Sequence, residues 1–62
     1  MISFTANKYQ YYEGLDDVSL YVQECGGYFE LQRYVIEFFV PEEYRDFFII
    51  KYPFLREVEY VY

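Results

Sequence analysis

Hydrophobic and polar residues alternate at the start of the chain, which is the period of a strand that is buried on one face. Three apolar residues occupy alternate positions there, and serine and threonine lie between them: Ile2, Phe4 and Ala6. The segment 9–13 is rich in tyrosine, a residue that favours strands. We therefore predict a β-hairpin over residues 2–13, with its turn at Asn7 and Lys8.

After residue 14 the apolar positions change to the helical period of 3.6 residues. The stripe is made of residues three and four positions apart: Leu15, Val18 and Val22. Two aspartates fit the negatively charged start of a helix, and two consecutive glycines fit its end. These features predict a helix over residues 16–25.

The longest apolar segment covers residues 28–40, and bulky side chains occur at both its odd and its even positions. A strand that is apolar on both faces is either central in a doubly covered sheet or part of a subunit interface. Because so small a chain has few residues to cover a sheet twice, we expect a dimer interface on the even-numbered face. Its members are Tyr34, Ile36, Phe38 and Val40.

The last third of the chain predicts one more helix and one more strand. Pro41 and the two glutamates after it are typical of a helix start, and this helix should end before Pro53. The alternative is a strand over residues 47–52, because of the Phe-Phe-Ile-Ile sequence there. Acidic and apolar residues alternate over residues 57–62, which predicts an edge strand with an acidic outer face.

These elements predict a single α+β domain over residues 1–62, with a small antiparallel sheet and one or two short helices in the order β-β-α-β-α-β. A domain of this size buries only about 60% of the surface that its unfolded chain exposes, and it commonly needs a disulfide, a metal or a second copy. Cys25 is the only cysteine, and the chain has no histidine. We therefore expect a homodimer.

The composition excludes several classes of function. Without histidine, Ser-His-Asp and Cys-His catalysis are impossible, and the three glycines do not form a phosphate-binding loop. We expect no enzyme activity, no cofactor and no metal. No apolar segment approaches the ~20 residues that span a bilayer, so we expect no membrane partner and a cytoplasmic location.

The charge points to a basic protein partner. Eleven acidic and five basic residues give a net charge of -6, and tyrosine and phenylalanine make up 27% of the chain. A negative surface repels nucleic acid and attracts basic proteins, and aromatic side chains are enriched at interfaces. The acids that we expect to contact the partner are Glu13, Asp16, Asp17, Glu57 and Glu59.

The acids on the last predicted strand are spaced in a way that suits imitation of DNA. Residues two apart on a strand repeat at about 6.6–6.8 Å, which is twice the spacing of about 3.4 Å per phosphate on one DNA strand. One alternative is a solvated surface with favourable charges at helix ends. A pair of Glu13 with Asp16 or Asp17 acting as acid and base is another alternative, and it requires burial.

A resemblance to a known family is carried by Gln-Tyr-Tyr-Glu at 10–13, Gly-Leu at 14–15 and Leu-Tyr at 20–21. These residues resemble the small acidic inhibitors of uracil-DNA glycosylase carried by Bacillus phages, over about residues 7–40. The resemblance implies a symmetric dimer that imitates DNA in the enzyme's cleft. It also implies that Glu13 contacts the enzyme and that an apolar pocket holds the enzyme's leucine probe. The residues of this pocket are Tyr12, Val18, Tyr21 and Val22.

The leading hypothesis is therefore a DNA-mimicking inhibitor of a DNA-processing enzyme, with uracil-DNA glycosylase as the named target. The alternative is an acidic antitoxin, an immunity-type module or another phage anti-defence protein that covers a basic surface without imitating DNA. A third hypothesis is an accessory subunit whose apolar strand completes the sheet of another protein.

Overall fold

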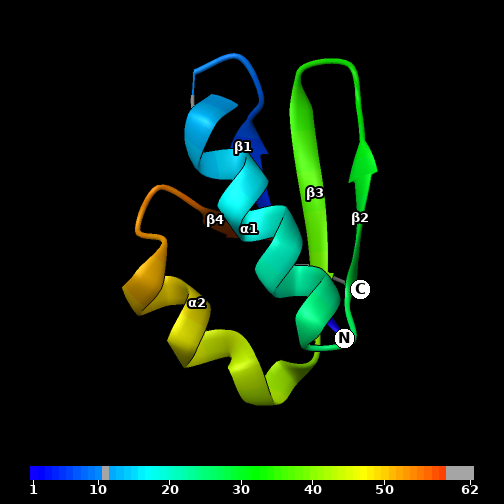
Figure 1. The fold of residues 1–62 in the computed structure, drawn as a ribbon, viewed down its shortest axis with the longest axis vertical. Helices are drawn as coiled ribbons and strands as arrows, with labels where there is room; N and C mark the ends of the chain where they lie inside the picture. Colours follow the sequence, from blue (N-terminus) through cyan, green and yellow to red (C-terminus); the bar gives the residue numbers. More distant parts are fainter. Residues whose placement is uncertain (11, 59–62) are drawn as a thin grey trace.

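The structure is a computed structural model that describes residues 1–10 and 12–58, and only the backbone of Tyr12. It contains two α-helices packed against a four-stranded antiparallel sheet, which confirms the predicted α+β class (Figure 1). The elements in chain order are β1 (Ile2–Asn7), α1 (Tyr12–Glu24), β2 (Tyr28–Leu31), β3 (Val35–Val40), the 3₁₀ helix η1 (Glu42–Tyr44), α2 (Arg45–Lys51) and β4 (Arg56–Val58).

The strands lie in the order β2-β3-β1-β4, and every neighbouring pair is antiparallel. Phe4 of β1 lies opposite Phe38 of β3 and also opposite Glu57 of β4. Phe38 in turn lies opposite Phe29 of β2. These residues point to the side on which both helices pack, and this side is the packed face of the sheet.

The alternate residues of each strand point to the other side, because successive side chains of a strand alternate between faces. No helix of the described chain covers this side, which is the far face of the sheet (Figure 1), yet Ser3 and Glu37 on it are only 1% and 9% exposed. The members of the far face are Ser3, Thr5, Asn7, Tyr28, Glu30, Val35, Glu37, Phe39, Arg56 and Val58.

The hydrophobic core lies between the packed face and the helices. The ring of Phe48 from α2 stacks on Phe4 with 6.1 Å between the centroids, and Val18 and Val22 of α1 have no exposed surface. Burying side chains of this size stabilises the fold by roughly 1.5–3 kcal/mol each.

The predicted hairpin over residues 2–13 is wrong, because only its first strand forms. The side-chain Oδ1 of Asn7 accepts hydrogen bonds from the backbone N–H groups of Tyr9 (3.0 Å) and Gln10 (3.1 Å). This side-chain turn ends the strand, as Asn commonly does. The chain then enters a helix at Tyr12, and the neighbours of β1 are β3 and β4.

The glycine stop predicted after the first helix is confirmed. Gly26 has a φ of 87°, and its N–H donates to the carbonyl oxygen of Gln23 at 3.2 Å. The N–H of Gly27 donates to the carbonyl oxygen of Val22 at 2.8 Å. This pair of bonds is the Schellman motif, which satisfies the last carbonyl groups of a helix.

The start of this helix lies four residues earlier than predicted, at residue 12 and not at residue 16. Gly14 suggested an interruption, yet it lies inside the first turn of α1. A Cβ at this position would lie 3.3 Å from the ring of Phe54, so the glycine lets that ring pack closely.

The single strand predicted over residues 28–40 is two strands, β2 and β3, which form a hairpin. The N–H of Gln32 donates to the carbonyl oxygen of Val35 at 2.9 Å and closes the turn. Two contacts from Lys8 hold it from outside. The Nζ of Lys8 donates to the carbonyl oxygen of Gln32 at 2.6 Å. The backbone N–H of Lys8 donates to the carbonyl oxygen of Tyr34 at 3.4 Å.

The helix predicted after Pro41 is confirmed, and the alternative strand over residues 47–52 is wrong. Pro41 is the residue before η1, which continues into α2 up to Lys51, two residues before Pro53. Phe48 points into the core while Ile50 is 81% exposed, as expected for a helix with one buried face.

Two further predictions need correction, one about the order of the elements and one about the C-terminal strand. The order of elements is β-α-β-β-α-β and not β-β-α-β-α-β. Glu57 lies on the packed face beside α2, not on an outer face, because it lies opposite Phe4. Glu59 and the remainder of the predicted strand lie outside the described residues. Within the described chain, neither α1 nor α2 has the length and apolar character needed to cross a membrane.

Candidate protein-binding surface

Four carboxylates lie on the solvent side of α1, opposite its buried stripe. Glu13, Asp17 and Glu24 are separated by four and seven residues, so they follow one line along a helix with 3.6 residues per turn. Asp16 lies beside this line, and Leu20 lies within it and is 63% exposed. Together these five residues form the acidic face of α1.

The acidic face is long and its charge is not compensated. Eleven steps of 1.5 Å separate Glu13 from Glu24 by about 16 Å along the helix axis, a length that contains about five phosphates of one DNA strand. Among the described residues, none of its four carboxylates takes part in an ion pair. The charge is therefore available to a basic partner.

Asp17 links the acidic face to the core. The hydroxyl of Tyr52 donates a hydrogen bond to Oδ2 of Asp17 at 2.7 Å, and the Tyr52 side chain is only 5% exposed. Burial, together with the hydrogen bond to Asp17, raises the pKa of Tyr52 far above its usual value of 10.0. The hydroxyl therefore keeps its proton and holds the Asp17 carboxylate in place.

The structure brings together only some of the acids that the sequence predicts as partner contacts. Three of them share the acidic face: Glu13, Asp16 and Asp17. Glu57 instead forms a two-point pair with Arg45, whose Nε donates to Oε1 and whose Nη2 donates to Oε2 at 3.0 Å. The hydrogen bonds from Arg45 lower the pKa of Glu57. Glu59 lies outside the described residues.

Three of the four residues predicted for an apolar pocket pack in the core or against α2. Val18 and Val22 have no exposed surface and belong to the core. Tyr21 packs against α2, with its ring centroid 5.0 Å from that of Phe47 and 5.1 Å from Nζ of Lys51. The side chain of the fourth predicted residue, Tyr12, lies outside the described part of the chain.

The residues predicted for a dimer interface lie mostly inside the molecule. Ile36, Phe38 and Val40 are at most 4% exposed, because they point to the packed face, which the helices cover. Tyr34 is 61% exposed in the turn between β2 and β3. The prediction named the face of this strand that the helices cover, and the opposite face carries Val35, Glu37 and Phe39.

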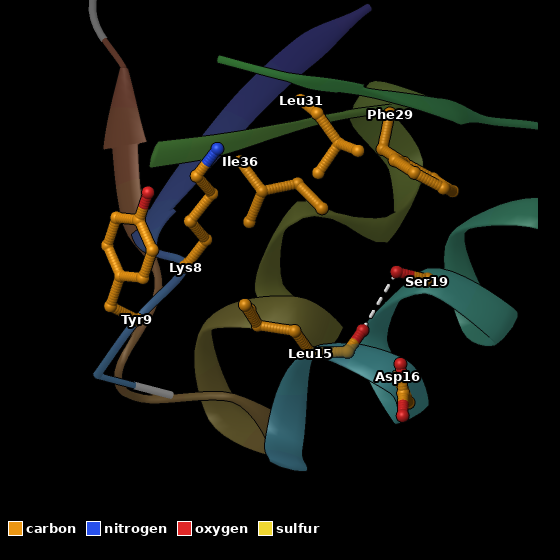
Figure 2. A pocket seen from close by; sticks show the side chains of 8 residues that line it. All are labelled: Lys8, Tyr9, Leu15, Asp16, Ser19, Phe29, Leu31 and Ile36. Atoms are coloured by element: carbon orange, nitrogen blue, oxygen red, sulfur yellow. Dashed lines mark hydrogen bonds between the residues drawn. The ribbon is translucent and has the colours of Figure 1, made fainter. Parts of the chain in front are cut away.

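An apolar groove lies between the N-terminal half of α1 and the β2–β3 side of the packed face (Figure 2). Its volume is about 410 Å³. Phe29, Leu31 and Ile36 line one wall, and Leu15 of α1 lies opposite them (Figure 2). Leu31 is 69% exposed, so part of this apolar surface faces solvent.

Polar groups surround the groove and connect it to the acidic face. Lys8 and Tyr9 close one end, and Asp16 and Ser19 lie on the α1 side (Figure 2). The Ser19 hydroxyl donates to the carbonyl oxygen of Leu15 at 2.8 Å, so this group is satisfied within the helix. Because Asp16 belongs to both, charge and apolar surface meet along one side of α1.

Sequence reasoning missed two members of the acidic face and all of the groove. Leu20 and Glu24 lie three and seven residues after Asp17. The helical period of the predicted helix therefore already indicated that they share a face with Asp17. The groove had no such signal, because residues 28–40 were expected to form one strand. Only the hairpin places Leu31 beside Ile36.

The acids that the sequence suggested as a catalytic pair are not buried in the structure. Glu13, Asp16 and Asp17 are exposed to solvent, whereas a catalytic carboxylate pair needs burial to separate its pKa values. Within residues 1–10 and 12–58, no three acidic or cysteine side chains approach closely enough to hold a metal ion.

No protein-family model, curated protein or solved structure matches this chain.

Proposed function

We propose that this chain is a small acidic inhibitor that occupies the basic DNA-binding cleft of a DNA-processing enzyme, and that uracil-DNA glycosylase is the first enzyme to test. The observation that carries the proposal is the acidic face of α1, with four uncompensated carboxylates along about 16 Å of one helix. The target's name comes from the resemblance over residues 7–40 and not from this geometry.

Charge and apolar surface have separate roles in such an inhibitor. A row of carboxylates raises the rate at which a basic cleft is found, but exposed charges alone give weak and salt-sensitive binding. An apolar contact that excludes water supplies additional binding free energy. Burying one leucine side chain contributes roughly 1.5–3 kcal/mol. Enzymes that flip a base can carry an apolar wedge in a basic cleft. The basic cleft is complementary to the carboxylates, and the wedge is complementary to the apolar surface.

The groove beside α1 replaces the predicted pocket as the site for the partner's apolar side chain. Its walls are Leu15, Phe29, Leu31 and Ile36, and Asp16 at its edge joins it to the acidic face. A partner that places basic residues along α1 therefore brings the groove within reach of an adjacent apolar side chain.

The test is a uracil-excision assay with stoichiometric amounts of this protein. The triple variant Glu13→Gln, Asp16→Asn, Glu24→Gln removes three charges and leaves the Asp17 bond to Tyr52 intact. We expect inhibition to weaken about ten- to hundredfold, since three exposed ion pairs of ~0.5–1 kcal/mol each correspond to that factor.

A matched control removes the same number of charges from the other helical segment, with Glu42→Gln, Glu43→Gln and Asp46→Asn. These three acids are exposed on η1 and the start of α2, and we expect little change in inhibition. Equal losses in the two triple variants would show that only total charge matters. If the unmodified protein does not inhibit, uracil-DNA glycosylase is not the target.

The second candidate function is an antitoxin or immunity-type module that covers a basic surface without imitating DNA. Leu20 favours it, because a 63% exposed apolar residue in the middle of the acidic face has no counterpart in a phosphate backbone. Competition separates the two functions. Duplex DNA displaces a mimic from its enzyme, whereas it leaves a non-mimic complex intact.

A further inference from the structure

We propose that an aromatic site between α1 and α2 binds the side-chain ammonium group of a lysine that a basic partner supplies. Its walls are the rings of Tyr21, Phe47 and Tyr52. In the free protein this ammonium site holds Lys51 of the chain itself. The inference rests on the proposed function only for the basic partner. The site can be tested with a small molecule, so its failure and that of the proposed function are distinguishable.

The structure itself places an ammonium group among the three rings. Nζ of Lys51 lies 5.1 Å from the ring centroid of Tyr21 on α1. It also lies 5.9 Å from the ring centroid of Phe47 and 5.7 Å from that of Tyr52. The negative face of a ring attracts a cation within about 6 Å, and proteins recognise ammonium ligands with several rings around one cation. The position is therefore favourable for an ammonium group.

Packing between the two helices fixes the walls of the ammonium site. The ring centroids of Tyr21 and Phe47 are 5.0 Å apart, and Tyr21 also meets Phe48 of the core edge to face. Tyr52 is only 5% exposed, and its hydroxyl is bound to Asp17. Because the core holds these rings, they keep their positions when one ammonium group replaces another.

Lys51 is held at the site by the rings alone. It is the last residue of α2, and its side chain is exposed. Among the described residues it forms no hydrogen bond and no ion pair. A lysine side chain gains rotamer freedom when it is released. The ring contacts that Lys51 gives up are made again by the group that replaces it, so the exchange costs little.

Carboxylates beside the rings favour the lysine of a partner over Lys51. Asp17 lies four residues before Tyr21 and Glu24 lies three residues after it, so both are its neighbours on the surface of α1. Burial and the hydrogen bond to Asp17 raise the pKa of Tyr52, and the negative charge of Glu24 raises it further. Within the described chain Lys51 pairs with neither carboxylate, whereas an incoming lysine can contact the rings and the acids together.

The class of ligand follows from the shape and charge of the site. The group that it holds now is a compact ammonium on a flexible four-carbon chain, which is the end of any lysine. A flat guanidinium group binds best to a carboxylate at two points, and Asp17 already accepts the Tyr52 hydroxyl. The net charge of -6 attracts partners that carry lysines on their surface.

The experiment is a nuclear magnetic resonance titration of the Lys51→Ala variant with n-butylammonium chloride, which reproduces a lysine side chain. Sodium chloride at equal concentration corrects for ionic strength. We expect the ring resonances of Tyr21 and Phe47 to shift, with a dissociation constant on the order of 10–100 mM from a few exposed ring contacts. The unmodified protein should bind roughly tenfold more weakly, because the tethered Lys51 competes for the site.

Two further comparisons show that both the charge and the rings are required. 1-Butanol has the same chain without the charge, and we expect it not to bind. Adding Phe47→Leu to Lys51→Ala should weaken butylammonium binding about two- to fivefold, since one of three rings is lost. Adding Tyr28→Leu on β2 removes an exposed ring elsewhere and should leave the binding unchanged. Circular dichroism checks that each variant is folded.

Several results would overturn the proposal. They are the absence of butylammonium binding to Lys51→Ala, equal binding of 1-butanol, and equal binding with and without Phe47→Leu. Equal binding to the unmodified protein would show that Lys51 does not occupy the site. None of these measurements involves uracil-DNA glycosylase, so a failed excision assay leaves them valid.

Discussion

Tyr52 is the residue at which the core, the end of α2 and the acidic face meet. Its ring lies 5.6 Å from that of Phe48 and 6.1 Å from that of Phe54, measured between centroids. Its hydroxyl reaches Asp17 on α1, 35 residues away in the chain. One buried hydroxyl therefore ties the helix that carries the acidic face to the C-terminal part of the molecule.

Replacing Tyr52 with phenylalanine should lower the free energy of unfolding by about 1–3 kcal/mol, because it removes a hydrogen bond to a carboxylate. Tyr9→Phe is the control, since Tyr9 is 72% exposed and should tolerate the same change. Urea unfolding followed by circular dichroism measures both. Equal stability of the two variants would mean that the hydroxyl bond contributes nothing.

The pH dependence of stability should follow from the same residue. The folded-state pKa of Tyr52 is raised above its usual 10.0, so its contribution is complete below that pH and is lost as the pH rises above it. Between neutral pH and one unit above 10.0, the unmodified protein should lose more stability than Tyr52→Phe. Parallel losses in both proteins would contradict this assignment.

At the scale of the elements, the junction between α1 and β2 depends on two glycines for different reasons. Gly26 has a positive φ but open space around its Cβ position. A Cβ on Gly27 would lie 2.1 Å from the carbonyl oxygen of Phe39 and 3.0 Å from a methyl carbon of Val22. The helix end is therefore pressed directly against the backbone of β3.

We expect Gly27→Ala to destabilise the fold more than Gly26→Ala. A side chain in the left-handed conformation costs about 1–2 kcal/mol, which is the expected loss at Gly26. At Gly27 the helix end and β3 must separate, so the loss should exceed this value. Thermal unfolding of both variants decides the matter, and a milder effect at Gly27 would be inconsistent with the close approach to Phe39.

The predictable elements were those whose signals are local. The Schellman end of α1 and the proline start of η1 need only a few neighbouring residues. The turn between β2 and β3 has no glycine, proline, asparagine or aspartate, and Lys8 supports it from a distant part of the chain. The helix start was missed because tyrosine favours strands, whereas the turn after β1 depends on the Asn7 side chain.

The same difference between local and long-range signals decides which parts of the candidate site could be predicted. Glu13, Asp16 and Asp17 could be placed on one surface from the sequence because they are only a few residues apart, although Glu13 was predicted on a strand and lies in α1. The pocket and the dimer face could not be placed. Both depend on which side of the sheet the helices cover, and a strand with apolar residues on both faces leaves that choice open.

At the scale of the whole molecule, stability rests on a small core, to which residues 1–10 and 13–58 contribute ten buried hydrophobic side chains. Phe48 holds α2 against the sheet and is fully buried. Phe48→Ala should cost about 3–5 kcal/mol, which is comparable to the total stability of a domain this small. We therefore expect this variant to be unfolded at room temperature.

Ile50→Ala is the matched control on the same helix, because Ile50 is 81% exposed. It should keep the near-ultraviolet circular dichroism and the dispersed amide resonances that Phe48→Ala loses. A folded Phe48→Ala variant would indicate that α2 contributes little to the core.

The position of β1 in the sheet has a consequence for how the chain folds. It precedes β3 and β4 in the chain, and these two strands are its neighbours in the sheet. On a ribosome it therefore waits with both edges unpaired until residues 35–40 and then 56–58 emerge. The contacts that complete the sheet join distant parts of the chain, and such topologies fold slowly and expose strand edges meanwhile.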